Sequence, residues 1–229
     1  MKFSKEMLRE KFSPGVESFL KPQAGRVAEI LRKQGIYKKA DRVYCGPSML
    51  LKQVRLNVLV DGKELVMPGP GMKEGFFLIR PFAIPFKNMS MAVTYKGLAR
   101  YGKRLDNSDL KGLNIDLLVD HPLMADESGF FLGDGKGFFD LALAVLAETG
   151  GLAAKFQVVA AVDDPERVVA ELPRDPWDFP CNAVLTPTGF NNVEGSRSRP
   201  AIFWDRIGID RIKRVTPLWK HYVATREKR

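Results

Sequence analysis

The sequence predicts an α/β protein in which layers of helices cover a largely parallel sheet. Segments with strand-like and helix-like patterns alternate along its 229 residues, as they do in chains built from βαβ units. Two strand-like segments, residues 156–162 and 182–186, are short and continuously apolar. Such runs are typical of parallel strands that are covered on both faces.

Helical patterns dominate the start of the chain. Residues 3–12 and 24–34 have amphipathic spacing, and Ser13-Pro14-Gly15 between them favours a break. A third helix is predicted over residues 47–59, with Ser48 as its N-terminal cap.

Two short strands are expected next, at Glu64–Met67 and Phe76–Ile79, separated by the turn-forming residues 68–71. Residues 80–112 contain several Pro, Gly and Met and show no clear period. We therefore expect an irregular connection there, which could form a flap over a site.

Three alternating glycines, Gly133, Gly135 and Gly137, stand between a predicted strand at 115–119 and a predicted helix at 138–148. Glycine lets the backbone approach an anion closely, and the N–H groups at the start of a helix favour negative charge. Lys136 would add a positive charge. The spacing is neither that of a P-loop nor that of the dinucleotide-binding fingerprint. An ordinary tight turn before a helix therefore stays the alternative to a phosphate site.

Carboxylates flank this glycine loop at Asp126 and Asp140. Mg²⁺ bound to nucleotide phosphates usually takes one or two carboxylates, so both are candidate ligands, and solvated caps are the alternative. In parallel sheets ligands bind at the carboxyl ends of strands. We expect the glycine loop, residues 163–165 and residues 186–189 to converge at that edge.

The net charge of +9 lies at the two ends of the chain. Residues 1–42 carry 11 Lys and Arg against 5 Asp and Glu, residues 197–229 carry 10 against 3, and the middle carries 15 against 19. Basic ends suit a polyanion such as a nucleotide, a polyglutamate tail or RNA, and equally a merely solvated surface.

Composition argues against several other classes of protein. The two cysteines, Cys45 and Cys181, lack a CxxC partner, and two histidines are too few for a His-based metal site. No Gly-x-Ser-x-Gly motif supports a catalytic triad. No apolar run is long enough for a membrane helix, and no signal-peptide pattern begins the chain, so we expect a cytoplasmic protein without a membrane partner.

The glycine loop resembles the signature of the 5-formyltetrahydrofolate cyclo-ligase family, approximately Asp-x-x-Gly-x-Arg-Leu-Gly-x-Gly-x-Gly-Tyr-Tyr-Asp after a strand that begins Ile-Asp-Leu. The matching residues here are Ile115, Asp116, Leu117, Asp126, Gly129, Leu132, Gly133, Gly135, Gly137, Phe138, Phe139 and Asp140. Residues 171–186 are similar to a second family segment, and Lys5-x-x-x-Arg9 is similar to its N-terminal helix. Residues 199–204 look like a segment of a divergent branch, the methenyltetrahydrofolate synthetase domain-containing proteins.

The resemblance implies a three-layer α/β/α fold with a mostly parallel, Rossmann-like sheet. It also implies an ATP- and Mg²⁺-dependent ligase of folate one-carbon metabolism that converts 5-formyltetrahydrofolate to 5,10-methenyltetrahydrofolate. The family's ATP-binding positions correspond to Lys5, Arg9, Gly133, Gly135, Lys136 and Gly137. Its metal-binding positions correspond to Asp140 and Asp178, and its folate-binding aromatic pair to Phe138 and Phe139.

Two departures keep alternatives open. Phe131 replaces the family's Arg, and Asp134 stands between the first two glycines, where it either ligates the metal or repels a triphosphate. A related enzyme, or a nucleotide- or pterin-binding protein without cyclo-ligase activity, is the first alternative. An RNA-binding adaptor is the second, because Trp204, Trp219 and Tyr222 lie among basic residues. We expect one domain over 1–195, with a basic extension over 196–229 packing on it.

Overall fold

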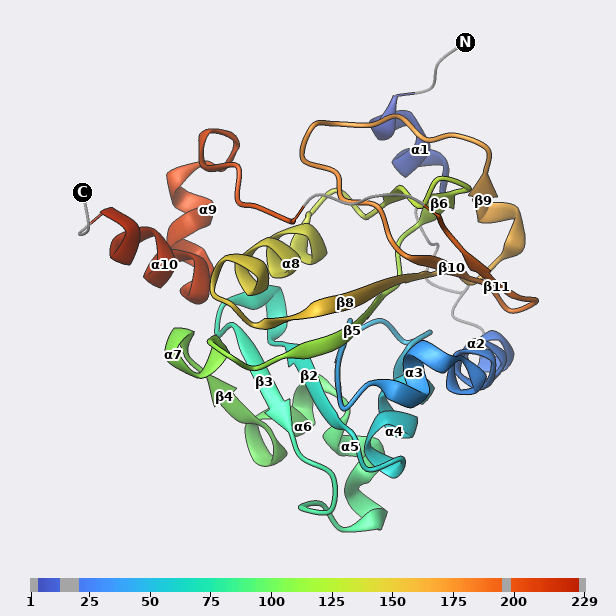
Figure 1. The fold of residues 1–229 in the computed structure, drawn as a ribbon, viewed down its shortest axis with the longest axis horizontal. Helices are drawn as coiled ribbons and strands as arrows, with labels where there is room; N and C mark the ends of the chain where they lie inside the picture. The colour runs from blue at the N-terminus through green and yellow to red at the C-terminus, as the bar shows by residue number, and fades with distance from the viewer. Residues whose placement is uncertain (1–3, 13–20, 195–198, 227–229) are drawn as a thin grey trace.

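A single eight-stranded sheet organises the fold. The computed structural model describes residues 4–12, 21–194 and 199–226. The strand order is β11-β10-β8-β5-β1-β2-β3-β4 (Figure 1). The bounds are β1 Arg42–Cys45, β2 Glu64–Pro68, β3 Phe76–Ile79, β4 Lys103–Leu105, β5 Ile115–Asp120, β8 Leu152–Ala161, β10 Ala183–Leu185 and β11 Phe190–Asn192.

The centre of this sheet is parallel and its edges are antiparallel. Strands β10, β8, β5, β1 and β2 pair in parallel, whereas β3, β4 and β11 run against their neighbours. In β1, Val43 pairs with both Leu65 and Leu117, which places this short strand between β2 and β5. The mostly parallel sheet confirms the predicted fold class.

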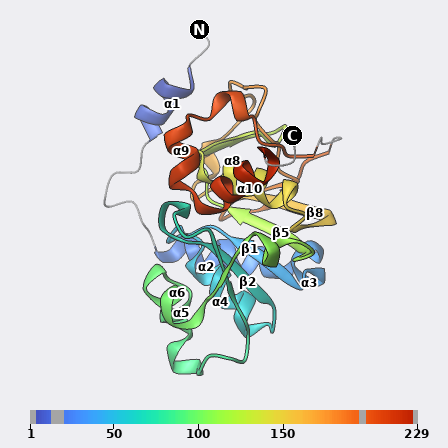
Figure 2. The same ribbon diagram turned by 90° about the vertical axis from the view of Figure 1, so that its left-hand side faces the viewer.

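Helices cover both faces of the sheet. One hydrophobic cluster joins one face to α8 (Phe138–Glu148), α9 (Ile209–Arg214) and α10 (Thr216–Arg226). A second cluster joins the other face to a different set of helices: α2 (Lys21–Lys33), α3 (Gly35–Lys39), α4 (Lys52–Val60), α5 (Met89–Ala92) and α6 (Tyr95–Tyr101). Figure 2 shows the two layers from the side, with α8, α9 and α10 above the strands and α2, α3 and α4 below. The arrangement is the expected α/β/α sandwich.

A second, three-stranded sheet lies beside the first. It consists of β7 (Phe131–Leu132), β6 (Met124–Asp126) and β9 (Val168–Val169). Helix α1 (Lys5–Phe12) packs against it through Leu8 and Phe12, which contact a small apolar cluster that includes Leu132 (Figure 1). Along the chain, β5 is followed by the β6–β7 hairpin and then by the glycine loop. The small sheet anchors the N-terminal helix near that loop.

Most long apolar segments form the predicted elements. Helix α8 spans the predicted residues 138–148, and β5 covers the predicted 115–119. Strand β8 begins at Leu152, earlier than the predicted 156. The predicted break at 13–15 lies outside the described residues.

Two predictions for the first half of the chain were wrong. Residues 80–112 are not an irregular connection, because they contain α5, α6, β4 and the short helix α7 (Asn107–Leu110). Helix α4 begins at Lys52 instead of 47, and its N-cap is Leu51 instead of Ser48. The Ser48 hydroxyl accepts a bond from the Leu50 N–H in a turn that precedes the helix.

A buried arginine fixes this turn. The Arg55 side chain is 1% exposed, and its guanidinium donates to the carbonyls of Gly46, Ser48 and Val93. These bonds join the end of central strand β1 to the region of α5 and α6. A buried guanidinium is tolerated because the carbonyl oxygens replace its water shell. Arg55 therefore holds the loop that carries Ser48 and Met49.

No helix among residues 4–12, 21–194 and 199–226 has both the length and the apolar character needed to cross a membrane.

Replacing Arg55 by leucine should lower the free energy of unfolding by about 3 kcal/mol, because three buried carbonyls lose their donor. Urea denaturation followed by circular dichroism measures this loss. Arg26→Leu, on the exposed face of α2, is the matched control and should change stability by less than about 0.5 kcal/mol. Equal stabilities of the two variants would contradict the role of Arg55.

Candidate functional site

The glycine loop turns sharply into α8. Gly135 has φ +85° and Gly137 has φ +58°, in the left-handed region that L-residues with a side chain rarely adopt. Gly137 is the N-cap of α8, and no side chain caps this helix in the described part of the chain. The first N–H groups of α8 are thus left for another acceptor, as in helix N-termini that bind anions.

Arg9 of α1 contacts this loop, and Lys5 of the same helix contacts the segment before β10. The Arg9 Nε donates to the Gly133 carbonyl at 3.2 Å. Lys5 Nζ donates to Asp175 at 2.7 Å and also to Asp178. Burial lowers the pKa of Lys5, but the two carboxylates outweigh it and raise the pKa above its ordinary value. The N-terminal helix is therefore tied to the loop and to the segment before β10.

These side chains enclose a cavity of ≈ 330 Å³, here called the charged cavity. Its wall includes Gly133, Gly135 and Gly137 of the loop. Its charged lining residues are Lys5, Arg9, Asp140, Asp175, Asp178, Arg206 and Arg211. Four elements distant in sequence thus contribute to one charged site.

Asp140 and Asp178 lie close enough to repel each other. The Asp140 side chain keeps solvent-exposed surface, yet protein atoms crowd it. This crowding and the Asp178 carboxylate together raise the pKa of Asp140 to about 6, although Lys5 opposes the shift. Two facing carboxylates are hard oxygen donors that suit Mg²⁺. Among the described residues no group of three or more His, Cys, Asp or Glu could hold a metal ion, so a bound Mg²⁺ would need further oxygens from a ligand.

A second cavity of ≈ 320 Å³ lies on the other side of the loop and is here called the aromatic cavity. It shares Gly133, Gly137 and Asp140 with the charged cavity. Its aromatic lining residues are Tyr44, Tyr95, Phe131, Phe138 and Phe139. The two cavities therefore meet at the glycine loop and the first turn of α8.

The two residues of the predicted aromatic pair, Phe138 and Phe139, differ in burial and contacts. Phe139 is 8% exposed and packs against Tyr44 and Phe131, with ring centroids 5.9 and 5.6 Å away. Phe138 is 36% exposed and faces the aromatic cavity beside the Arg211 guanidinium. Phe139 is part of the core and of the cavity wall, whereas Phe138 offers an open ring.

Asp120, at the carboxyl end of β5, is a further polar group of the aromatic cavity. Burial raises its pKa to about 7, and Asp140 and Asp134 add to the shift while His121 opposes it. A Cβ on Gly46 would lie 2.0 Å from an Asp120 oxygen, so glycine is needed where β1 ends. Asp120 can donate or accept a proton near neutral pH.

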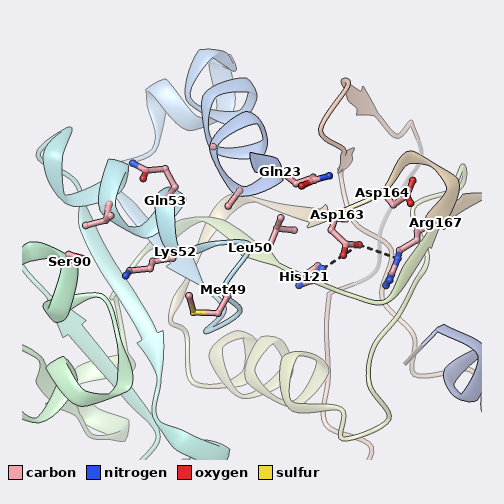
Figure 3. A pocket seen from close by; sticks show the side chains of 13 residues that line it. Gln23, Met49, Leu50, Lys52, Gln53, Ser90, His121, Asp163, Asp164 and Arg167 are labelled. Carbon is pink, nitrogen blue, oxygen red and sulfur yellow. Dashed lines mark ion pairs between the residues drawn. The ribbon is translucent and has the colours of Figure 1, made fainter. Parts of the chain in front are cut away.

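A third cavity of ≈ 530 Å³ adjoins the aromatic cavity at Met49 and His121. Figure 3 shows Asp163 between His121 and Arg167 on its wall. Ser48 Oγ lies 2.7 Å from His121 Nδ1, but His121 Nε2 is 3.9 Å from Asp163 Oδ1. That distance is too long for a hydrogen bond, so these residues do not form the relay of a catalytic triad.

The comparisons with known proteins identify this architecture. The model of the 5-formyltetrahydrofolate cyclo-ligase family matches residues 4–187. The chain belongs to this family. The matched range contains the glycine loop, Lys5, Arg9, Asp140 and Asp178, and it excludes α9 and α10.

Individual relatives are more distant. The chain is similar to the methenyltetrahydrofolate synthase domain-containing protein of Bos taurus, with 27% identity over 196 residues, 84% of this chain and 51% of the relative. The Homo sapiens protein of that name is 26% identical over 189 residues, 79% and 48% of the two chains. The chain thus spans about half the length of these relatives. The solved structure of Aquifex aeolicus 5,10-methenyltetrahydrofolate synthetase has a TM-score of 0.56 at 23% identity, over 87% of this chain and 98% of that one, and supports the fold.

Two acidic residues of this family member have local partners. The Asp126 side chain is 0% exposed, and its oxygens accept from the N–H groups of Phe130 and Leu172. It holds the β6–β7 hairpin and lines neither the charged nor the aromatic cavity. Asp134 faces the aromatic cavity and forms an ion pair of 3.0 Å with Lys136. The loop's own lysine is therefore partly neutralised.

The predicted convergence of three strand ends holds only in part. The glycine loop reaches the two adjoining cavities and Asp163 reaches the third, but residues 186–189 close the β10–β11 hairpin instead. Thr186 Oγ1 accepts there from the Gly189 N–H at 3.0 Å. Antiparallel β11, which the sequence did not predict, explains this difference.

Asp140→Asn should stabilise the unliganded protein at pH 7, because it removes a charge that is crowded by protein atoms and repelled by Asp178. Solvent screening of the exposed carboxylate limits the gain to about 1 kcal/mol. The pKa of Asp140 is raised to about 6, so between about pH 4 and 6 the folded state binds more protons than the unfolded state. Wild-type stability relative to the variant should fall as pH rises through that window. Thermal unfolding from pH 4 to 7 tests this.

The matched control is Glu127→Gln, at an exposed carboxylate near the same loop. It should show no such pH-dependent difference. A wild type that is more stable than Asp140→Asn at pH 7 would contradict the repulsion between Asp140 and Asp178.

Proposed function

We propose that the protein converts 5-formyltetrahydrofolate to 5,10-methenyltetrahydrofolate with consumption of ATP. The main support is the meeting of a charged and an aromatic cavity at one loop, with Gly133, Gly137 and Asp140 common to both. Phosphoryl transfer between two substrates depends on positioning and charge neutralisation more than on a protein nucleophile. Family membership indicates which two substrates these are.

The proposed reaction proceeds between the two substrates and needs no covalent intermediate with the enzyme. The formyl oxygen attacks the terminal phosphorus of ATP, and ADP leaves. The folate N10 then attacks the activated formyl carbon and loses its proton, and the carbon–oxygen bond breaks to release phosphate, which carries the formyl oxygen away and can take up that proton. The products are 5,10-methenyltetrahydrofolate, ADP and phosphate.

The charged cavity would take the nucleotide. The backbone of Gly133, Gly135 and Gly137 would face the phosphates, with the N-terminus of α8, whose N-cap is Gly137, beside it. Lys5 and Arg9 supply positive charge from α1. Lys136 lines neither cavity and pairs with Asp134, so it would have to leave that pair to reach a phosphate. Asp140 and Asp178 would hold Mg²⁺, which neutralises charge on the transferred phosphoryl group when bound.

The aromatic cavity would take the folate. Phe138 offers its open ring to the pterin, and Phe139 forms the wall together with Tyr44. Asp120 can hydrogen-bond to pterin nitrogens from the end of β5, because its pKa of about 7 leaves both protonation states populated. Asp140 lines both cavities and would therefore lie between the two proposed ligands.

The direct test mixes 5-formyltetrahydrofolate with Mg-ATP and follows methenyl-folate absorbance and phosphate release together. Wild type should form both products in equal amounts. Asp178→Asn should lower kcat/KM by about 100-fold or more, because it removes a proposed metal ligand while keeping the side-chain shape. The control Glu171→Gln, an exposed carboxylate in the same segment, should retain wild-type activity. Absence of methenyl-folate with folded wild-type protein would reject the proposal.

A second candidate is a protein on this scaffold that binds nucleotide and pterin without turnover. The ion pair between Asp134 and Lys136 favours this second candidate, because the pair neutralises the only cation of the glycine loop itself. Both side chains are more than half exposed, so the pair is weak and a ligand can break it.

Asp134→Asn should therefore tighten Mg-ATP binding by up to about fivefold, since an exposed ion pair contributes at most about 1 kcal/mol. Isothermal titration calorimetry measures the change, and Lys136→Gln should shift affinity in the opposite direction. Weaker binding by Asp134→Asn would indicate that Asp134 itself holds the metal. Tight binding of both ligands without product would favour the second candidate.

The RNA-binding alternative gains no support from the C-terminal aromatics. Trp204 packs on Tyr222 with ring centroids 5.3 Å apart, and Trp219 stacks on the same tyrosine at 5.9 Å. These rings contact one another instead of presenting a row of open faces. Salt-dependent filter binding still tests that hypothesis.

A further inference from the structure

The C-terminal segment places an arginine on the glycine loop. Arg211 belongs to α9, outside the residues that match the family model. Its Nη2 donates to the Lys136 carbonyl, and its guanidinium lies 5.9 Å from the centre of the Phe138 ring. The same nitrogen would be 3.5 Å from a Cβ on Gly137. Arg211 is therefore held directly beside the turn that begins α8.

The other cations of the charged cavity already have carboxylate partners. Lys5 pairs with Asp175 and Asp178, Arg9 with Glu6, and Arg206 with its neighbour Asp205. Within the described residues, Arg211 has no carboxylate within ion-pair distance, although Asp140 lies near enough to interact with it, and its one hydrogen bond goes to the neutral Lys136 carbonyl. A guanidinium has five N–H donors, so most of those on Arg211 remain available.

The charge balance of the cavity depends on the C-terminal segment. Seven charged side chains line it, four cations and three carboxylates. Without Arg206 and Arg211, two cations would face three carboxylates, and the cavity would repel a polyanion. With them, the lining side chains alone carry one more positive than negative charge before any metal binds. The segment therefore makes the lining of the cavity more favourable to phosphates.

We propose that Arg211, supported by Arg206, is a phosphate-binding residue that the C-terminal segment contributes to the nucleotide site. The planar fork of a guanidinium matches two phosphate oxygens, and the bond to the Lys136 carbonyl keeps it in position beside the Phe138 ring. The nucleotide site would then extend beyond residues 4–187, which match the family model, and removing the segment would take two cations from the lining of the charged cavity. This inference rests on the proposed binding of ATP and concerns which residues recognise its phosphates.

Calorimetry on the full chain tests the proposal with Mg-ATP, Mg-ADP and adenosine as probes. Arg211→Gln should weaken Mg-ATP binding by about 10-fold or more, because a hydrogen-bonded ion pair with phosphate is lost. Arg211→Lys keeps the charge without the fork and should bind with intermediate affinity. Adenosine has no phosphates, so the variants should bind it as the wild type does.

Arg214→Gln is the matched control, an exposed arginine of the same helix that does not line the cavity. It should bind Mg-ATP as tightly as the wild type, and thermal unfolding without ligand should show that the Arg211 variants are folded. Unchanged Mg-ATP affinity in Arg211→Gln would overturn the inference and leave the proposed function standing. Equal weakening for ATP and adenosine would also overturn it, because the effect would then not concern phosphates. A wild type that binds no Mg-ATP would overturn the proposed function and this inference together.

Discussion

The left-handed backbone at Gly135 and Gly137 is the constraint on which the site depends. This turn lets the chain leave the β6–β7 hairpin and enter α8 within a few residues, and it brings the backbone close to the side chains of Arg9 at Gly135 and Arg211 at Gly137. It sets Asp140 in the first turn of α8, at the boundary between the charged and aromatic cavities. A side chain at either glycine would strain the turn and move this boundary. The loop thus determines where two ligands could meet.

The loop does not make the site alone, because its charges come from distant parts of the chain. Helix α1 supplies Lys5 and Arg9, the segment before β10 supplies Asp178, and α9 supplies Arg211. Carboxylates and cations are nearly balanced there, so small changes in their number decide whether a phosphate or a metal is attracted. The raised pKa of Asp140 means that its ionised carboxylate destabilises the ligand-free protein, as is common at functional sites. A bound cation would offset this destabilisation.

Sequence patterns predicted the parts of this structure that local spacing determines. The apolar run at 138–148 predicted α8, and the glycines with Asp140 predicted the loop, because these signals lie within about 15 residues of one another. Strand β1 was missed because Arg42–Cys45 is only four residues long and begins with a charge. Arg55 and Arg211 resemble solvated helix residues in sequence, and only tertiary packing gives them their partners. Asp120 offered a usable signal, since it directly follows the predicted strand at its carboxyl end.

The central claim is that two adjoining cavities hold nucleotide and folate at the same time. The most direct measurement is a calorimetric titration of a non-hydrolysable Mg-ATP analogue into the protein, with and without saturating 5-formyltetrahydrofolate. Because the two cavities share only Gly133, Gly137 and Asp140 among their lining residues, the account predicts that the analogue binds with equal or greater affinity when the folate is present. Competition between the two ligands would show that they share one cavity and would contradict the account.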